Sequence, residues 1–188
     1  MSYTAFLQIG TPKQTFELTV DNNSPITWIP SAECMTPGCS GKMVYEHDKS
    51  STYSQNGSSV SMDYPIGQVK GYLSEDSAQF LNTNLKPAVF RFVEATDLAF
   101  WFNRVPADGV LGLGWETSEN SAKDQKQATS IINEFYRQGL LTENSFSVFL
   151  NNESNKDGSQ LILGGYDQRY FEGKLDNHQI ADEKKWNL

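Results

Sequence analysis

The sequence predicts a mostly β protein with one substantial helix. Short segments in which apolar and polar residues alternate recur along the chain, and Gly-, Pro- and Asn-rich stretches separate them. Only Thr129–Gln138 carries apolar residues at helical spacing, and Gly139 follows it where a C-terminal cap belongs. The apolar stripe of this helix consists of Ile131, Ile132, Phe135 and Tyr136.

Two strands at the start of the chain lead into a candidate catalytic carboxylate. Residues 3–9 alternate as a first strand, and Thr15–Val20 forms a second strand that runs into Asp21. A turn-forming Asn-Asn-Ser-Pro follows at once, which places the carboxylate at an edge within reach of the Ser24 hydroxyl. Trp28 is a large anchor with one N–H donor. An aspartate at such a junction is ordinarily a turn residue, and these residues alone leave both interpretations open.

The rest of the chain adds further strands and a glycine-rich core segment. Alternation predicts strands at Ser59–Met62, Gln68–Leu73, Phe80–Leu85, Ala88–Val93, Ser145–Leu150, Gln160–Leu163 and Gly173–Ile180. The first two form a hairpin with Tyr64–Gly67 at its tip. Ala107–Trp115 combines apolar side chains with glycines that permit close backbone approach, and residues 117–127 are expected to be loop.

Composition excludes several classes of partner. The chain has 188 residues and a formal net charge of −8, which disfavours nucleic acid and anionic membranes. No run of apolar residues is long enough for a membrane span, and the sequence contains no nucleotide-binding loop. We therefore expect a globular protein without a nucleic-acid, membrane or cofactor partner.

The two cysteines favour a local disulfide over a metal site. Cys34 and Cys39 flank a short loop with Pro and Gly, and the histidines at His47 and His178 lack zinc-ligand spacing relative to them. A disulfide implies an oxidising compartment. Three glycosylation sequons are compatible with secretion, and they lie at Asn22, Asn56 and Asn152.

The order of these signals resembles the amino-terminal lobe of the pepsin-like aspartic peptidases. The matching segments, in chain order, are Ile9–Phe16, Asp21–Trp28, the Cys34/Cys39 loop, Lys49–Tyr53, Tyr64–Gly67, Asp108–Leu113, Phe146–Leu150 and Leu163–Asp167. The resemblance implies that residues 1–188 form one lobe of a bilobal β fold, without metal or cofactor, acting on a peptide or protein. It also implies the secretory pathway, either extracellular or in an acidic lysosome- or vacuole-like compartment.

The resemblance assigns roles to several residues. Asp21 would be one half of a carboxylate pair that shares a proton, and Ser24 would hydrogen-bond it. Tyr64 would be the flap tyrosine that closes over substrate, with its hydroxyl bound by the Trp28 indole N–H. Apolar subsites that favour hydrophobic substrate residues would be lined by Gly67, Trp101, Phe102 and Val110. Trp101 and Phe102 are equally compatible with plain core packing.

Two departures from the family pattern bear on activity. The family motif Asp-Thr-Gly is Asp21-Asn22-Asn23 here. Asn tolerates positive φ, so Asn23 is expected to hold the turn, while Asn22 is not expected to reproduce the contact that threonine makes with the other lobe. No second Asp-Thr-Gly or Asp-Ser-Gly follows downstream, so this chain brings one catalytic carboxylate and lacks the carboxy-terminal lobe.

Three functions follow from these observations. The first is an aspartic endopeptidase represented by its amino-terminal lobe and inactive as this chain alone. The second is a non-catalytic lobe that binds peptide or protein through its half-cleft. The third is a homodimer like the retroviral-type peptidases, which ranks last because the chain lacks strands that complete the sheet between two pepsin-type lobes.

Overall fold

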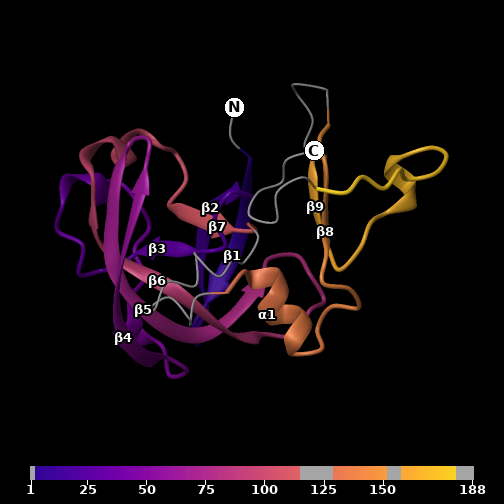
Figure 1. Ribbon diagram of the computed structural model, residues 1–188. Helices are drawn as coiled ribbons and strands as arrows, with labels where there is room; N and C mark the ends of the chain where they lie inside the picture. Colours follow the sequence, from indigo (N-terminus) through magenta and orange to yellow (C-terminus); the bar gives the residue numbers. More distant parts are fainter. Residues whose placement is uncertain (1–2, 115–128, 152–157, 181–188) are drawn as a thin grey trace.

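The computed structural model describes residues 3–114, 129–151 and 158–180 and is mostly β, as predicted (Figure 1). The strands are β1 Thr4–Ile9, β2 Gln14–Asp21, β3 Trp28–Pro30, β4 Ser54–Tyr64, β5 Gly67–Phe80, β6 Ala88–Leu98, β7 Gly109–Gly112, β8 Phe146–Phe149 and β9 Gln160–Leu163. The described α-helix is α1, Ile131–Arg137, and short 3₁₀ turns occupy Pro37–Cys39, His47–Lys49, Phe100–Arg104 and Gln168–Tyr170. The predicted loop 117–127 and the sequon at Asn152 lie outside the described residues.

Seven strands form one sheet in the order β1-β2-β7-β3-β6-β5-β4. Most neighbours are antiparallel, but β2 runs parallel to β7 and β3 runs parallel to β6. β1 also pairs with β5, so the sheet folds back on itself. This closure brings the end of β2 and the tip of the long β4–β5 hairpin to the same part of the molecule.

Two apolar clusters hold the sheet together. The larger one contains Phe16, Phe90 and Phe92 from the sheet and receives Ile131 and Phe135 from α1. These side chains are almost fully buried, and each contributes about 1.5–3 kcal/mol by the area that it removes from water. The helix crosses below the sheet and covers its end (Figure 1).

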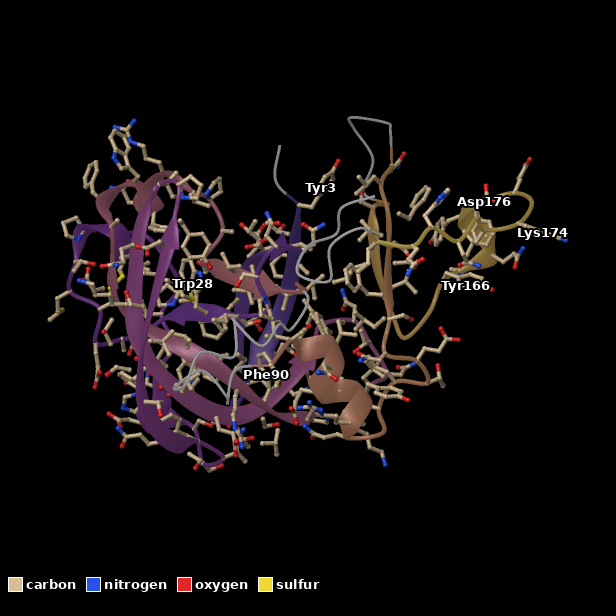
Figure 2. All side chains as sticks on the ribbon, in the orientation of Figure 1. Tyr3, Trp28, Phe90, Tyr166, Lys174 and Asp176 are labelled. Carbon is tan, nitrogen blue, oxygen red and sulfur yellow. A yellow bond between two sulfur atoms is a disulfide. The ribbon has the colours of Figure 1, made fainter. Side chains whose placement is uncertain are left out.

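The smaller apolar cluster is built around Trp28, which lies inside the sheet region (Figure 2). Val69 and Leu73 from β5, with Val93 from β6, pack in the same cluster and are fully buried. The part of the hairpin next to its tip is therefore fixed against the body of the sheet. Tyr64, at its tip, packs against the edge of this cluster.

The hairpin β8–β9 forms a separate two-stranded sheet that lies above α1 in Figure 1, and its Phe146, Leu161 and Leu163 pack against the larger apolar cluster. The chain that follows it extends further outward and carries the exposed Tyr166 at its start (Figure 2). Among the described residues, no helix is both long enough and apolar enough to cross a membrane.

Two of the predicted strands are wrong, and β4, β5 and β6 extend beyond their predicted bounds. Phe80–Leu85 is not a strand, because β5 continues unbroken to Phe80 and the chain then turns. The predicted strand Gln68–Leu73 in fact continues through the polar stretch Ser74–Gln79, in which Ser74 and Asp76 are buried and hydrogen-bonded. Gly173–Ile180 is also not a strand. Nearly all of its residues are exposed, and no described strand lies beside it to form backbone hydrogen bonds.

Candidate active site

Asp21 is the last residue of β2, which lies between β1 and β7 in the seven-stranded sheet. It lies opposite Gly112 of the parallel strand β7, and its carbonyl accepts a hydrogen bond from the Leu113 amide at 2.8 Å. The backbone N–H of Asn23 donates to Asp21 Oδ1 at 2.8 Å. The carboxylate is thus oriented by the turn that follows it.

The turn after Asp21 packs closely on the end of β7. A side chain at Gly114 would place its Cβ 2.6 Å from the carbonyl carbon of Ser24, so only glycine fits there. The expectation that Asn23 adopts positive φ is wrong, because Asn82 is the one described non-glycine residue with positive φ. Asn22 and Asn23 are exposed, so the turn accommodates both side chains by pointing them into solvent.

Tyr64 reaches the site from the tip of the β4–β5 hairpin. The indole Nε1–H of Trp28 donates to the Tyr64 hydroxyl at 2.9 Å, which is the contact that the resemblance implies. Phe102 completes an edge-to-face trio, with ring centroids 5.4 Å from Trp28 and 5.8 Å from Tyr64. These contacts hold the phenol over the region beside Asp21.

The environment of Tyr64 keeps its phenol protonated. Burial, and secondarily the charge of Asp21, raises the pKa of Tyr64 to about 12, although hydrogen bonds from Trp28 and Ser24 lower it. The hydroxyl accepts from the indole, which leaves its own proton to be donated to Ser24 or to a ligand. Tyr64 therefore offers a neutral hydrogen-bond donor beside a carboxylate.

A pocket of about 270 Å³ lies between Asp21 and this aromatic trio. Its walls include the predicted site residues Asp21, Trp28, Tyr64, Phe102 and Val110. The sequence analysis did not anticipate the other lining residues, which are Thr19, Val20, Lys42, Ile66, Val105, Ala107 and Gly109. No local pattern pointed to Lys42, because it lies in a loop far from the motif of Asp21 in the sequence.

Three other predicted site residues, Ser24, Gly67 and Trp101, do not line this pocket. The Ser24 hydroxyl accepts from the Ile26 amide at 3.2 Å and hydrogen-bonds Tyr64, and the backbone amide of Asn23 takes the place predicted for Ser24 at the Asp21 carboxylate. Gly67 has φ +128°, and a Cβ there would lie 2.3 Å from that of Ala99. Trp101 is 54% exposed, with the Arg104 guanidinium over its ring at 4.8 Å, and it is not among the pocket-lining residues.

The disulfide prediction is confirmed, since Cys34 and Cys39 are bonded. Between them, Thr36 Oγ1 donates to the carbonyl of Leu98 at 3.1 Å and accepts from its amide at 3.0 Å. The loop is therefore pinned to the end of β6, directly before the turn that carries Phe102. Within the described ranges, no group of three or more acidic, histidine or cysteine side chains could hold a metal ion.

The chain is similar to known proteins over nearly its whole length. The family model for eukaryotic aspartyl protease matches residues 2–188. The chain is 32% identical to vacuolar protease A of Arthroderma otae, over 99% of this chain and 46% of that protein. It is 31% identical to pepsin A of Rhinolophus ferrumequinum, over 100% and 47%, and 30% identical to plasmepsin I of Plasmodium falciparum, over 96% and 39%. The chain thus spans about half the length of these relatives, or less.

Proposed function

This chain belongs to the eukaryotic aspartyl protease family, and on that premise we propose that it is the amino-terminal half of an aspartic endopeptidase active site. Asp21 supplies one catalytic carboxylate, and Tyr64 closes the site from above. The observation that carries the proposal is their common pocket, in which the carboxylate, the phenol and the Trp28 indole line one apolar hollow.

The chemistry requires a second carboxylate opposite Asp21. In such a pair one carboxylate is ionised and takes a proton from the attacking water, while the other is protonated and polarises the scissile carbonyl. Asp21 alone cannot divide these roles. The partner carboxylate must come from a second lobe or from a second copy of this chain, and we favour the second lobe because the relatives are about twice as long.

The substrate is a peptide or protein that binds in extended form beneath the hairpin. Apolar side chains dominate the pocket walls, and they favour hydrophobic residues next to the scissile bond. The disulfide supports an oxidising compartment, and the relatives include a vacuolar protease and a pepsin. We therefore place the protein in the secretory pathway or in an acidic, vacuole-like compartment.

The test compares the 188-residue chain with the product of the complete reading frame. A hydrophobic fluorogenic peptide is assayed between about pH 3 and 6, where such a carboxyl pair is half-protonated. The complete product should cleave it, and Asp21→Asn should abolish cleavage while retaining the shape of the side chain. The 188-residue chain should not cleave, since losing the paired arrangement removes about 10²–10⁴-fold in rate. Cleavage by the short chain that depends on Asp21 would instead establish a homodimer.

A second candidate is a lobe that binds peptides without cleaving them. The feature in its favour is the pair Asn22-Asn23, which on the resemblance to the family stands where Thr-Gly is expected. The complete product would then bind the peptide but leave it intact, and Asn22→Thr with Asn23→Gly would restore cleavage. Cleavage by the unaltered product excludes this candidate.

A further inference from the structure

Lys42 lies in the wall of the catalytic pocket without an acidic partner. Its Nζ donates to the carbonyls of Val105 at 3.0 Å and Ala107 at 2.6 Å, both of which line the same pocket. An ammonium has three N–H donors, so these two bonds leave one for a ligand. Within residues 3–114, 129–151 and 158–180, no carboxylate forms a salt bridge with Lys42.

The nearby acid, Asp108, is already committed to the backbone. Its Oδ1 accepts from the Met43 amide and its Oδ2 accepts from the Glu17 amide, each at 2.9 Å. Burial lowers the pKa of Lys42, and the charge of Asp108 opposes that change only in part. A cation that has lost hydration and is paired only with neutral carbonyls gains more from an incoming carboxylate than a fully hydrated cation would.

Thr19 provides a second polar group in the same pocket. Its Oγ1 is buried and lacks a hydrogen-bond partner within the described part of the chain, which ordinarily costs free energy. Thr19 precedes Asp21 by two positions on β2, so both side chains lie on one face of the strand, about 6–7 Å apart along it. Rotation of the Thr19 side chain about χ1 would turn this covered hydroxyl toward a group that enters beside Asp21.

The strand register places the lysine at the end of the pocket away from Asp21. On β7, Gly112 lies opposite Asp21 and Val110 lies opposite Thr19. Ala107, whose carbonyl holds the Lys42 ammonium, precedes Val110 by three residues and is further still from Asp21. A negatively charged group bound at Lys42 would thus lie apart from the catalytic carboxylate.

We propose that Lys42 and Thr19 form a carboxylate-recognising end of this otherwise apolar pocket, so that it prefers glutamate over glutamine while it still accepts hydrophobic residues. The aliphatic stem of glutamate would pack against the apolar walls formed by Phe102, Val105 and Val110. Its carboxylate would accept from the ammonium and the hydroxyl. This inference rests on the proposed endopeptidase function and makes Lys42 a specificity-determining residue of that site.

The test measures cleavage of a peptide library by the complete product at about pH 5.5, where free glutamate is mostly ionised. At each position around the scissile bond, peptides with Glu are compared with otherwise identical peptides with Gln. One position should show a Glu-over-Gln ratio of kcat/KM of about tenfold, the size expected for a charge-assisted hydrogen bond. This ratio does not depend on the fraction of active enzyme in a preparation.

Variants of Lys42 and Thr19 test whether these two residues cause the preference for Glu over Gln. Lys42→Met should bring the ratio to about one, Lys42→Arg should retain it, and Thr19→Val should reduce it. Lys49→Met is the matched control, since it removes the same charge from an exposed side chain that pairs with Glu46 and lies outside the pocket. It should leave the ratio unchanged.

The outcomes separate this inference from the proposed function. Cleavage with no Glu preference at any position, or with a preference that survives Lys42→Met, overturns the inference and leaves the endopeptidase intact. If no peptide is cleaved, the endopeptidase proposal is wrong. Calorimetric binding of the same peptide pairs then tests whether the carboxylate site exists. A Glu peptide that then binds no more tightly than its Gln counterpart overturns the carboxylate site as well.

Discussion

Replacing Tyr64 with phenylalanine tests whether the hydrogen bond from Trp28 holds the tip of the β4–β5 hairpin. Trp28 is 1% exposed, and its indole N–H donates to the Tyr64 hydroxyl at 2.9 Å. Tyr64→Phe keeps the ring and its edge-to-face contacts but leaves that donor without its acceptor. A buried donor that loses its partner costs about 1–3 kcal/mol.

The expected loss lies at the lower end of this range. Tyr64 is only partly buried, so water can reach the vacated position and replace part of the bond. We therefore expect Tyr64→Phe to lower the free energy of unfolding by about 1 kcal/mol. In a chain of 188 residues this corresponds to a decrease in Tm of roughly 2–4 °C.

The assay is urea and thermal unfolding of four proteins in a double-mutant cycle. They are the unaltered chain, Tyr64→Phe, Trp28→Phe and the double variant, and the coupling free energy should be about 1 kcal/mol. Tyr136→Phe on α1 is the control, since this exposed phenol should change stability by less than about 0.5 kcal/mol. A coupling free energy near zero, or equal stability of the Tyr64 and Tyr136 variants, would refute the reasoning.

Three further predictions concern the flap, the partly exposed His47 and the disulfide. Gly67→Ala should destabilise by about 1–3 kcal/mol in urea unfolding, because its φ of +128° suits only glycine and the new Cβ would meet Ala99. His47→Gln should lower Tm more at pH 5.5 than at pH 8.5, because a hydrogen bond to Glu94 raises the pKa of His47. Replacing both cysteines of the disulfide with serine should cost about 2 kcal/mol of unfolding free energy, the loop-closure value for so short a loop.

Each of these predictions has a discriminating control. Ala99→Gly should recover the steric part of the Gly67→Ala loss but not the part due to φ. For His47, a folded-state pKa above the ordinary value means that its stabilisation is complete below about pH 6.5 and disappears as the pH rises through the folded value. A Tm difference that grows with pH would contradict the assignment. Equal stability of the serine variant and the unaltered chain would show that the disulfide does not contribute to the free energy of unfolding.

The parts of the fold that the sequence predicted are those with strong local signals. Alternating apolar residues located β1, β2 and β9, and helical spacing located α1 to within a few residues. The candidate site was predicted in part, because Asp21 ends a strand before a turn and Tyr64 lies at a hairpin tip. Each of these two features can be recognised from a short contiguous segment, and the family resemblance indicated that the two segments belong to one site.

The remaining features depend on contacts between distant residues. Lys42 enters the pocket only because its loop folds back onto Val105 and Ala107, and no pattern around Lys42 predicts that. Trp101 and Phe102 are adjacent in sequence, yet Trp101 is exposed and Phe102 is buried. Both lie in one 3₁₀ turn, in which successive side chains point in different directions. Periodicity has no means of distinguishing two aromatic residues within such a turn.

The part of β5 that the sequence did not predict, Ser74–Phe80, contains the polar residues that support the hairpin. Its polar stretch is a strand because Asp76 is buried under hydrogen bonds from Tyr45 and Thr52. Glu94, on the neighbouring strand β6, accepts from Ser74 and, through its other oxygen, is bonded by the His47 ring.

These bonds bind the 45–52 segment to the root of the hairpin, whereas the apolar cluster of Trp28 holds the tip that carries Tyr64. Root and tip are therefore stabilised by different forces. Removing the charge of His47 weakens the root, but it leaves unchanged the apolar packing that holds Tyr64 over Asp21. A rise in pH should thus loosen this lobe from the base of its longest hairpin before it alters the site itself.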